Sequence, residues 1–582
     1  MLRLLKNLKK KDLKLAGGVA LFVILQVWLD LTMPDFTKKL TESVSAGTIQ
    51  MNDVLRNGGF MLLCAFGSMV CAILCGLFSA LIAADFAKIL REKLFGHILT
   101  FSNAEINRFQ TPSLITRTTN DIVQLQFLLA MGLQILFKAP VLAVCAIAKI
   151  STKSFEWTLA VFICVVIMAA TAGSLVRIAY PKFKRIQKLV DALNDSAREN
   201  ISGVRVVRAF NAEKFQQKKF EKVNKDITDN HLFTSRVLGL MMPIMTLCLS
   251  GLTLAIYWIG AYLVNRAPVP ERAVIIGEMT AFSQYALQVV AAFIMLVAIF
   301  VVIPRVMVSV NRLNEVLDAK TSIAYPDNNV NKTEEGTVEF KNVTFSYNDS
   351  GEPCLKDISF KINKGETFAI IGATGTGKTT LINLIPRYYD VTDGEILVDG
   401  VNIKEYPEKQ LEELISIAPQ KAVMFMGDIK SNVTYGCEEE ISDDDERIRN
   451  ALEIAHADYV YELEKGIHGE VAQGGTNHSG GQKQRISIAR AIFKNSEIMI
   501  FDDTFSALDY KTDMLVRKSI KEKLSGRTVI IVAQRIGTIK NADKILVLSD
   551  GKAVGLGKHE ELLDSCPIYK EIALSQLSEE EL

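Results

Sequence analysis

The stretch Gly372-Ala-Thr-Gly-Thr-Gly-Lys378-Thr379 decides the fold of the second half of this chain. It follows the apolar run 367–371, which has the composition of a buried strand, and it leads into 378–385, which favours a helix. A strand, a glycine-rich loop and a helix in this order are typical of a phosphate-binding loop. The stretch therefore predicts a nucleotide site within an α/β domain.

The residue types of this loop suit a nucleoside triphosphate. Lys378 would bring a positive charge to the outer phosphates, and Thr379 would give Mg²⁺ an oxygen ligand. We expect Thr376 and Thr380 to belong to the same site. The backbone N–H groups that converge on phosphate oxygens would come from a loop whose glycines are Gly372, Gly375 and Gly377. ATP with Mg²⁺ is the predicted cofactor.

Two acidic residues follow a second apolar run, 498–501. Asp502 is expected at the carboxyl end of a strand beside the loop, where it would hold Mg²⁺ through water. Asp503 comes directly after it, and Gln534 follows a further apolar strand.

The bulk composition excludes some classes of protein. A length of 582 residues predicts two or more domains, and a formal net charge of +1 gives no electrostatic reason to expect nucleic acid as a partner. The nine cysteines contain no CxxC pair, and most lie in apolar runs. We therefore expect small buried side chains rather than a disulfide framework or a metal site.

The first half contains six apolar runs long enough to cross a membrane as helices. They are residues 13–33, 60–84, 128–150, 157–176, 237–264 and 275–303. A basic segment precedes the first run, but that run is too long for a signal peptide and has no small-residue cleavage site, so a retained span is expected. The connections after the second and fourth spans are long and basic, which places them and the amino terminus in the cytoplasm.

These two connections have few turn-forming residues and are predicted to continue the spans as helices into the cytoplasm. Within the second one, the segment 199–210 is expected to turn at Gly203. This turn fits either a contact with a cytosolic domain or an ordinary solvated helix.

A few polar residues interrupt the spans. They are Gln26, Asp30, Lys138, Gln284 and Gln288. Such residues usually face a bundle interior or a cavity, so they are candidates for a polar pathway. For Asp30 and Lys138 the alternative is that they pair or extend toward an interface.

A turn-rich polar segment ends at Gly336, and the alternating strand that follows it begins the second domain. We expect a transmembrane domain at 1–310, a linker at 311–336 and a nucleotide-binding domain at 337–582. The predicted fold class is an all-α domain of six spans with long cytosolic extensions, followed by an α/β domain with a phosphate-binding loop.

Between the two phosphate-site motifs lies Ser479-Gly-Gly-Gln482-Lys-Gln-Arg-Ile-Ser-Ile-Ala-Arg-Ala, and after them comes Ser506-Ala-Leu-Asp509. This set resembles the ATP-binding cassette superfamily. One cassette behind six spans resembles a half-transporter of the ABC exporter type. The resemblance covers nearly the whole chain, and its soluble motifs are the specific part.

The resemblance implies roles for further residues. Tyr347 would stack on adenine, and Gln420 would reach Mg²⁺ and sense the membrane domain. Asp509 would couple two ATP sites. The signature tetrad would close over an ATP held by a second cassette; its members are Ser479, Gly480, Gly481 and Gln482. The leucine that usually precedes this tetrad is His478 here.

Two departures from the family pattern affect hydrolysis. The family's glutamate base is Asp503 in this chain, and its histidine at the terminal phosphate is Gln534. A carboxylate one methylene shorter lies farther from the attacking water, and an amide carries neither the charge nor the proton of an imidazole. Asp503 is therefore a weak base in this expectation.

Because the tetrad is intact while the chain's own site is weakened, the resemblance favours the degenerate-site subunit of a bacterial heterodimeric multidrug exporter. The expected partners are a homologous half-transporter, membrane lipid and a small amphipathic drug or lipid as cargo. The expected location is the plasma membrane, with the amino terminus and the cassette in the cytoplasm. Two alternatives stay open, namely an ATP-gated membrane regulator and a homodimeric exporter with slow turnover.

Overall fold

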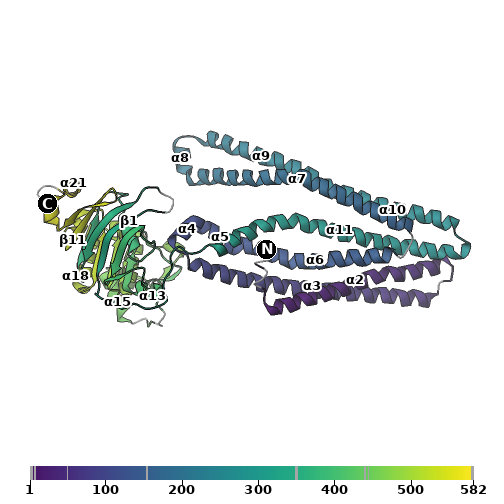
Figure 1. Ribbon diagram of the computed structural model, residues 1–582, viewed down its shortest axis with the longest axis horizontal. Coiled ribbons are helices and arrows are strands. Elements are labelled where there is room, and N and C mark those ends of the chain that lie inside the picture. Colours follow the sequence, from purple (N-terminus) through teal and green to yellow (C-terminus); the bar gives the residue numbers. More distant parts are fainter. Residues whose placement is uncertain are drawn as a thin grey trace. The chain divides into compact units, whose positions relative to one another are not determined.

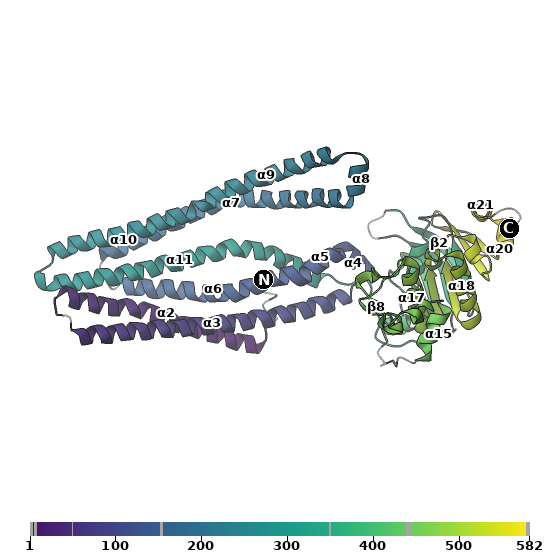
Figure 2. The same cartoon turned by 180° about the vertical axis from the view of Figure 1, so that it is seen from behind.

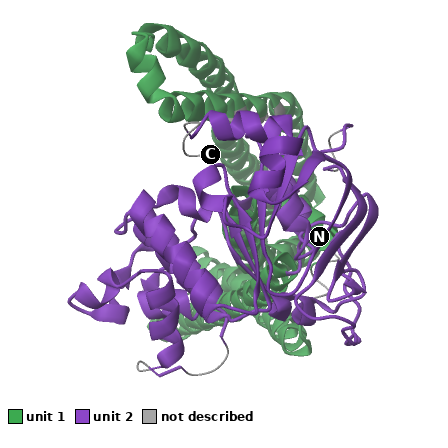
Figure 3. Cartoon of the chain, turned by 90° about the vertical axis from the view of Figure 1, so that its left-hand side faces the viewer, with its two compact units in different colours: residues 1–99, 112–319 green, residues 100–111, 320–582 purple. Residues whose placement is uncertain are grey.

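The computed structural model describes residue 4 and residues 8–48, 50–151, 155–347, 351–437, 441–442 and 445–577. Two compact units make up the chain (Figure 3). The first unit contains Met1–Leu99 and Pro112–Ala319, and the second contains Thr100–Thr111 and Lys320–Leu582.

The first unit is built of helices, most of them long (Figure 1). They are α2 (Lys10–Ser45), α3 (Met51–Leu99), α5 (Thr111–Thr116), a π-helical turn η1 (Arg117–Asp121), α6 (Ile122–Ser151), α7 (Phe155–Ser202), α8 (Val204–Ala209), α9 (Glu213–Gly239), α10 (Met241–Arg266) and α11 (Val269–Asp318). Both Figure 1 and the reverse view in Figure 2 show α7 running alongside α9 and α10. α7 ends at Ser202 and α8 begins after Gly203, which confirms the predicted turn.

Six helical stretches of the described chain are long and apolar enough to cross a membrane, which confirms the predicted number of spans. They are Lys10–Ser45, Met51–Leu99, Thr111–Ser151, Phe155–Lys182, Glu213–Arg266 and Val269–Val297. Helices suit these apolar runs because each backbone N–H and C=O group finds its partner within the same segment when water is absent. Trp157 is buried between helices of this unit. Its ring lies 5.3 Å from that of Phe282, and its Nε1 donates to the backbone oxygen of Ile256 at 3.2 Å.

The described part of the second unit holds three sheets. The strands of the six-stranded sheet, in spatial order, are β12 (Lys552–Gly557), β11 (Lys544–Ser549), β3 (Thr367–Ile371), β10 (Thr528–Val532), β9 (Ile498–Asp502) and β6 (Ile415–Ala418). All of its pairings are parallel except that of β11 with β12. An antiparallel sheet has the order β2 (Leu355–Ile362), β1 (Val338–Phe345), β4 (Asp393–Val398) and β5 (Val401–Asn402), and β7 (Gly427–Asp428) pairs with β8 (Glu470–Val471).

The second unit also contains helices. They are α4 (Asn103–Phe109), α12 (Lys378–Leu384), α13 (Glu408–Leu414), α14 (Ile429–Val433), α15 (Glu446–Ile454), α16 (Tyr459–Glu462), α17 (Gly480–Phe493), α18 (Tyr510–Lys523), α19 (Ile536–Ile539), α20 (His559–Ser565) and α21 (Pro567–Leu574), with 3₁₀ turns η2 (Gly466–His468), η3 (Gln473–Gly475) and η4 (Thr504–Ala507).

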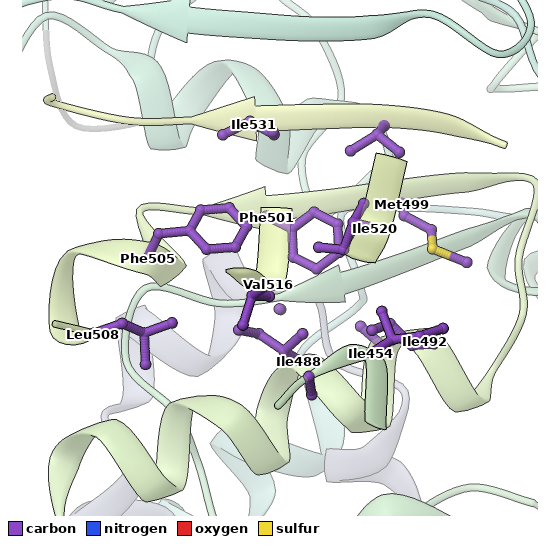
Figure 4. Packing of buried hydrophobic residues seen from close by; sticks show 14 of the residues in the cluster. Ile454, Ile488, Ile492, Met499, Phe501, Phe505, Leu508, Val516, Ile520 and Ile531 are labelled. Carbon is purple, nitrogen blue, oxygen red and sulfur yellow. The ribbon is translucent and has the colours of Figure 1, made fainter. Parts of the chain in front are cut away.

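Alternate residues of the central strands enter two different hydrophobic cores. In β9, Met499 and Phe501 join the core that includes residues of α17 and α18, whereas Ile498 and Ile500 face the core shared with β1 and β2. Figure 4 shows Phe501 packed near Val516 of α18 and Ile488 of α17. Because both faces are covered, these strands are continuous apolar runs, as parallel strands usually are.

The parallel register brings the carboxyl ends of four strands to one edge. Asp502 at the end of β9 lies opposite Val532 of β10, and Val532 lies opposite Ile370 of β3. Phe501 in turn lies opposite Ala418 of β6. The loops that follow these strands therefore meet, as ligand-binding loops do in open α/β sheets.

The six-span helical domain and the α/β domain agree with the fold class expected from the sequence. The proposed limits at 310 and 336 stay a prediction; α11 ends at Asp318, and β1 begins at Val338.

Candidate functional site

The phosphate loop connects β3 to α12, and its glycines are required by the backbone. Gly375 has φ +86° and Gly377 has φ +96°, a left-handed conformation that residues with a side chain rarely adopt. A Cβ on Gly372 would lie 2.2 Å from the backbone oxygen of Leu548. The loop can therefore keep this path only with glycine at these positions.

Lys378 is held over the loop. Its Nζ donates to the backbone oxygens of Gly372 and Ala373, at 2.8 Å each, and the residue is only 8% exposed. Burial lowers the pKa of Lys378, and the nearby carboxylates of Asp503 and Asp502 oppose this effect. The ammonium is thus already positioned where a phosphate group would replace backbone oxygens as its partner.

Asp502 lies beside the first residues of α12. The Thr379 hydroxyl donates to Asp502 Oδ1 at 3.3 Å. Burial raises the pKa of Asp502 to about 6, and repulsion from Asp503 adds to this, while Thr379 and Lys378 act in the opposite direction. A carboxylate, a hydroxyl and the side-chain oxygen of the nearby Gln420 are the hard oxygen donors that Mg²⁺ prefers, so the residues fit this ion.

Asp503 is fixed by two amides. Gln420 Nε2 donates to Asp503 Oδ2 at 3.1 Å, and Gln534 Nε2 donates to the same oxygen at 2.8 Å. The residue is 8% exposed, and its φ of +45° lies in the left-handed region. Both lone pairs of Oδ2 are therefore occupied by protein N–H groups.

The aromatic residue expected at adenine lies next to the loop. The hydroxyl groups of Tyr347 and Thr380 lie 3.0 Å apart, and Tyr347 is 38% exposed, which leaves part of its ring accessible. The Thr376 hydroxyl bonds within the loop instead, donating to the backbone oxygen of Ala373 at 3.0 Å. Thr376 thus shapes the loop, whereas Thr380 connects it to the aromatic residue.

Sequence reasoning missed Tyr389 and Asn107. The rings of Tyr347 and Tyr389 lie 5.3 Å apart and nearly perpendicular, and Asn107 Nδ2 of α4 donates to the Tyr389 hydroxyl at 3.2 Å. Tyr389 follows α12 closely in the sequence, so its position could have indicated a place near the loop. Asn107 had no such signal, because nothing in the sequence relates position 107 to position 389.

The signature tetrad does not join this cluster in the described part of the chain. Ser479 caps α17, where its Oγ accepts from Gln482 N at 3.3 Å and its own N–H donates to Gln482 Oε1 at 2.9 Å. Ser479 and Gly480 are exposed, Gly481 and Gln482 are half-buried, and His478 Nε2 lies 3.2 Å from the backbone oxygen of Glu470. Within the tetrad, Ser479 and Gln482 thus each bond through their side chain to the backbone N–H of the other.

Asp509 is also exposed and caps the next helix. Its Oδ1 accepts from Thr512 N at 3.0 Å at the start of α18, and hydrogen bonding to Thr512 lowers the pKa of Asp509. The site residues therefore form two groups, one around the phosphate loop and one on exposed helix starts.

Comparison with known proteins relates both units to one family. The model of the ABC transporter transmembrane region matches residues 17–293, and the ABC transporter model matches residues 355–506. An uncharacterized ABC transporter ATP-binding protein of Mycobacterium tuberculosis is 37% identical over 520 residues, which cover 89% of this chain and 87% of the relative. The ATP-dependent lipid A-core flippase of Hahella chejuensis is 30% identical over 512 residues, covering 87% and 85%.

A solved structure has the same fold. A bacterial Atm1-family ABC exporter with ATP bound superimposes with a TM-score of 0.81 at 24% identity, over 97% of this chain and 98% of that one. With six apolar helices, this chain is a multi-pass membrane protein of the kind found in the plasma membrane, with its cassette in the cytoplasm. The chain belongs to the ABC transporter family, as an exporter-type half-transporter that fuses one membrane region to one ATP-binding domain.

Proposed function

We propose that this chain is one half of a heterodimeric ABC exporter and that ATP bound to its own phosphate loop is hydrolysed poorly. The observation that supports this proposal is the pair of amides, Gln420 and Gln534, that donate to Asp503. A general base must accept a proton from water within hydrogen-bond distance. Asp503 Oδ2 can do so only after it loses one of these donors.

The groups that bind nucleotide are complete, in contrast. Lys378, Thr379 and Asp502 would hold the phosphates and Mg²⁺, and Tyr347 would stack on the base. Mg²⁺, when bound, neutralises charge on the phosphates. We infer that the chain retains ATP, which would keep two cassettes together.

The exposed tetrad and Asp509 would act on the other nucleotide. Ser479 with the glycine N–H groups at the start of α17 would contact ATP held by the partner, whose site would carry out most of the hydrolysis. Closure of the cassettes would then pass through the long helical extensions and turn a cavity outward.

The proposed cargo is an amphipathic drug or lipid. The described spans are predominantly apolar, which suits such molecules. The name of the Hahella chejuensis relative, a lipid A-core flippase, favours lipid.

ATP turnover by the purified chain, alone and with its partner half, tests the proposal. We expect slow turnover alone and at least about tenfold faster turnover for the pair, since a general base contributes about 100-fold to 10,000-fold. Equal turnover in both preparations would favour a homodimeric exporter. Slow turnover that persists in the pair would favour an ATP-gated regulator.

Restoring the family residues should activate the chain's own site. We expect the double variant Asp503→Glu, Gln534→His to raise hydrolysis at this site about tenfold, because the longer carboxylate reaches the water and only the Gln420 amide, no longer that of Gln534, donates to it. Single-turnover measurements on the pair, with the partner's site inactivated, would record this change. The two single variants serve as controls and are expected to gain less; a double variant no faster than the parent would contradict the argument from Asp503.

A further inference from the structure

Three of the polar residues within the spans form one cluster. Asp30 of α2 and Lys138 of α6 face each other, with Lys138 Nζ 3.7 Å from Asp30 Oδ2. Ser68 of α3 donates to the other carboxylate oxygen, Asp30 Oδ1, at 2.5 Å. Three spans thus meet at one ion pair, which resolves the open choice for Asp30 and Lys138 in favour of pairing.

Lys138 and Asp30 form an ion pair without a hydrogen bond between them. A separation of 3.7 Å is too long for a hydrogen bond, so Asp30 balances the charge of Lys138 without accepting one of its protons. An ammonium has three N–H donors, and Lys138 makes no hydrogen bond to any residue that the structure describes. In an apolar surrounding, unsatisfied donors are costly, and an added acceptor would stabilise them.

Further polar atoms lie on the same side of α2. Pro34 has no N–H group, so the backbone oxygen of Asp30 lacks its partner within the helix. Gln26, one turn before Asp30, is 8% exposed and makes no side-chain hydrogen bond within the described chain. The cluster therefore offers both donors and acceptors.

The cluster lies within the predicted spans and is partly exposed. Asp30 is about 25 Å along the helix from the cytoplasmic start of the apolar run at residue 13, in a hydrocarbon core about 30 Å thick. The side chains of Asp30 and Lys138 are 16% and 23% exposed. An amphiphile whose tail stays in the hydrocarbon could therefore bring its head group to this pair.

We propose that Asp30, Lys138 and Ser68 bind the zwitterionic head group of a membrane amphiphile, with its phosphate on Lys138 and its ammonium on Asp30. A zwitterion satisfies both members of the pair and adds no net charge to the apolar region, whereas an anion alone would be repelled by Asp30. This assignment rests on the proposed export function and specifies its cargo.

Binding of three lipids with the same lauroyl chain tests the site without ATP. They are lysophosphatidylethanolamine, lysophosphatidic acid and monoacylglycerol, titrated into the full chain in nanodiscs. We expect the zwitterion to bind about tenfold more tightly than either of the others, the gain of one or two charged hydrogen bonds. Equal affinity for the three lipids would overturn the proposal, whatever the ATP turnover of the chain.

Variants separate this site from a purely structural ion pair. Lys138→Met should abolish the preference for the zwitterion, and Asp30→Asn should shift it toward lysophosphatidic acid. Lys149→Met is the matched control, because Lys149 lies on the same helix and pairs with Asp35 at 2.7 Å; it should keep the preference.

The double variant Asp30→Asn, Lys138→Met leaves no unpaired charge, so it should stay folded and bind the three lipids equally. A double variant that retains the zwitterion preference, or variants that lose thermal stability with the lipid order unchanged, would assign the pair to structure alone.

Discussion

Replacing Lys378 by alanine is expected to weaken ATP binding to this chain by about a hundredfold, since hydrogen bonds to a charged group contribute about 1.5–3 kcal/mol each. The ammonium already lies over the loop, bonded to the oxygens of Gly372 and Ala373, and no other described lysine or arginine makes these contacts. The variant loses the positive charge nearest the outer phosphates, and neither Thr379 nor Asp502 can replace it. Equilibrium binding of a fluorescent ATP analogue to the full-length chain would measure the change.

Lys364→Ala is the matched control for this experiment. Lys364 is an exposed lysine of the same unit that pairs with Glu335, also exposed, so its removal should leave nucleotide affinity unchanged. If Lys378→Ala and Lys364→Ala bind ATP equally well, the assignment of residues 372–379 to the phosphates is wrong.

Replacing Ser479 by alanine is expected to lower ATP hydrolysis by the paired complex about a hundredfold, because one lost donor at a transition state costs on this scale. Affinity for ATP on this chain should change much less, since the side-chain hydroxyl of Ser479 in the described structure bonds only to Gln482 of its own tetrad. Turnover of the complex and nucleotide affinity of this chain are therefore measured on the same preparation.

Ser479 is also the N-cap of α17, and losing an N-cap lowers the stability of a helix. A control variant that removes an N-cap far from the tetrad is therefore needed. Asp445→Ala removes the cap of α15, where Asp445 accepts from Arg447 N at 2.8 Å, and should leave hydrolysis intact. A Ser479→Ala variant that weakens nucleotide binding on this chain more than it slows the complex would reverse the proposed division between the two sites.

The prediction from the sequence was most successful where residues act close together along the chain. The apolar run 367–371, the glycines and Lys378 fall within a dozen positions, so strand, loop and helix could be placed directly. The spans were equally clear, because a membrane requires a long uninterrupted apolar segment. The ends of helices were harder to predict, since α2 continues to Ser45, well beyond the apolar run that ends at residue 33.

The sequence by itself determined the six spans, the phosphate loop and the replacement of the family's glutamate and histidine by Asp503 and Gln534, because these depend on residue type and local order. Only the tertiary structure decided that Gln420 and Gln534 share one oxygen of Asp503, that Asn107 reaches Tyr389, and that Lys138 stands close to Asp30 without bonding to it. Those contacts join segments up to 282 positions apart, and their distances are set by strand register and helix packing, which residue order alone does not specify.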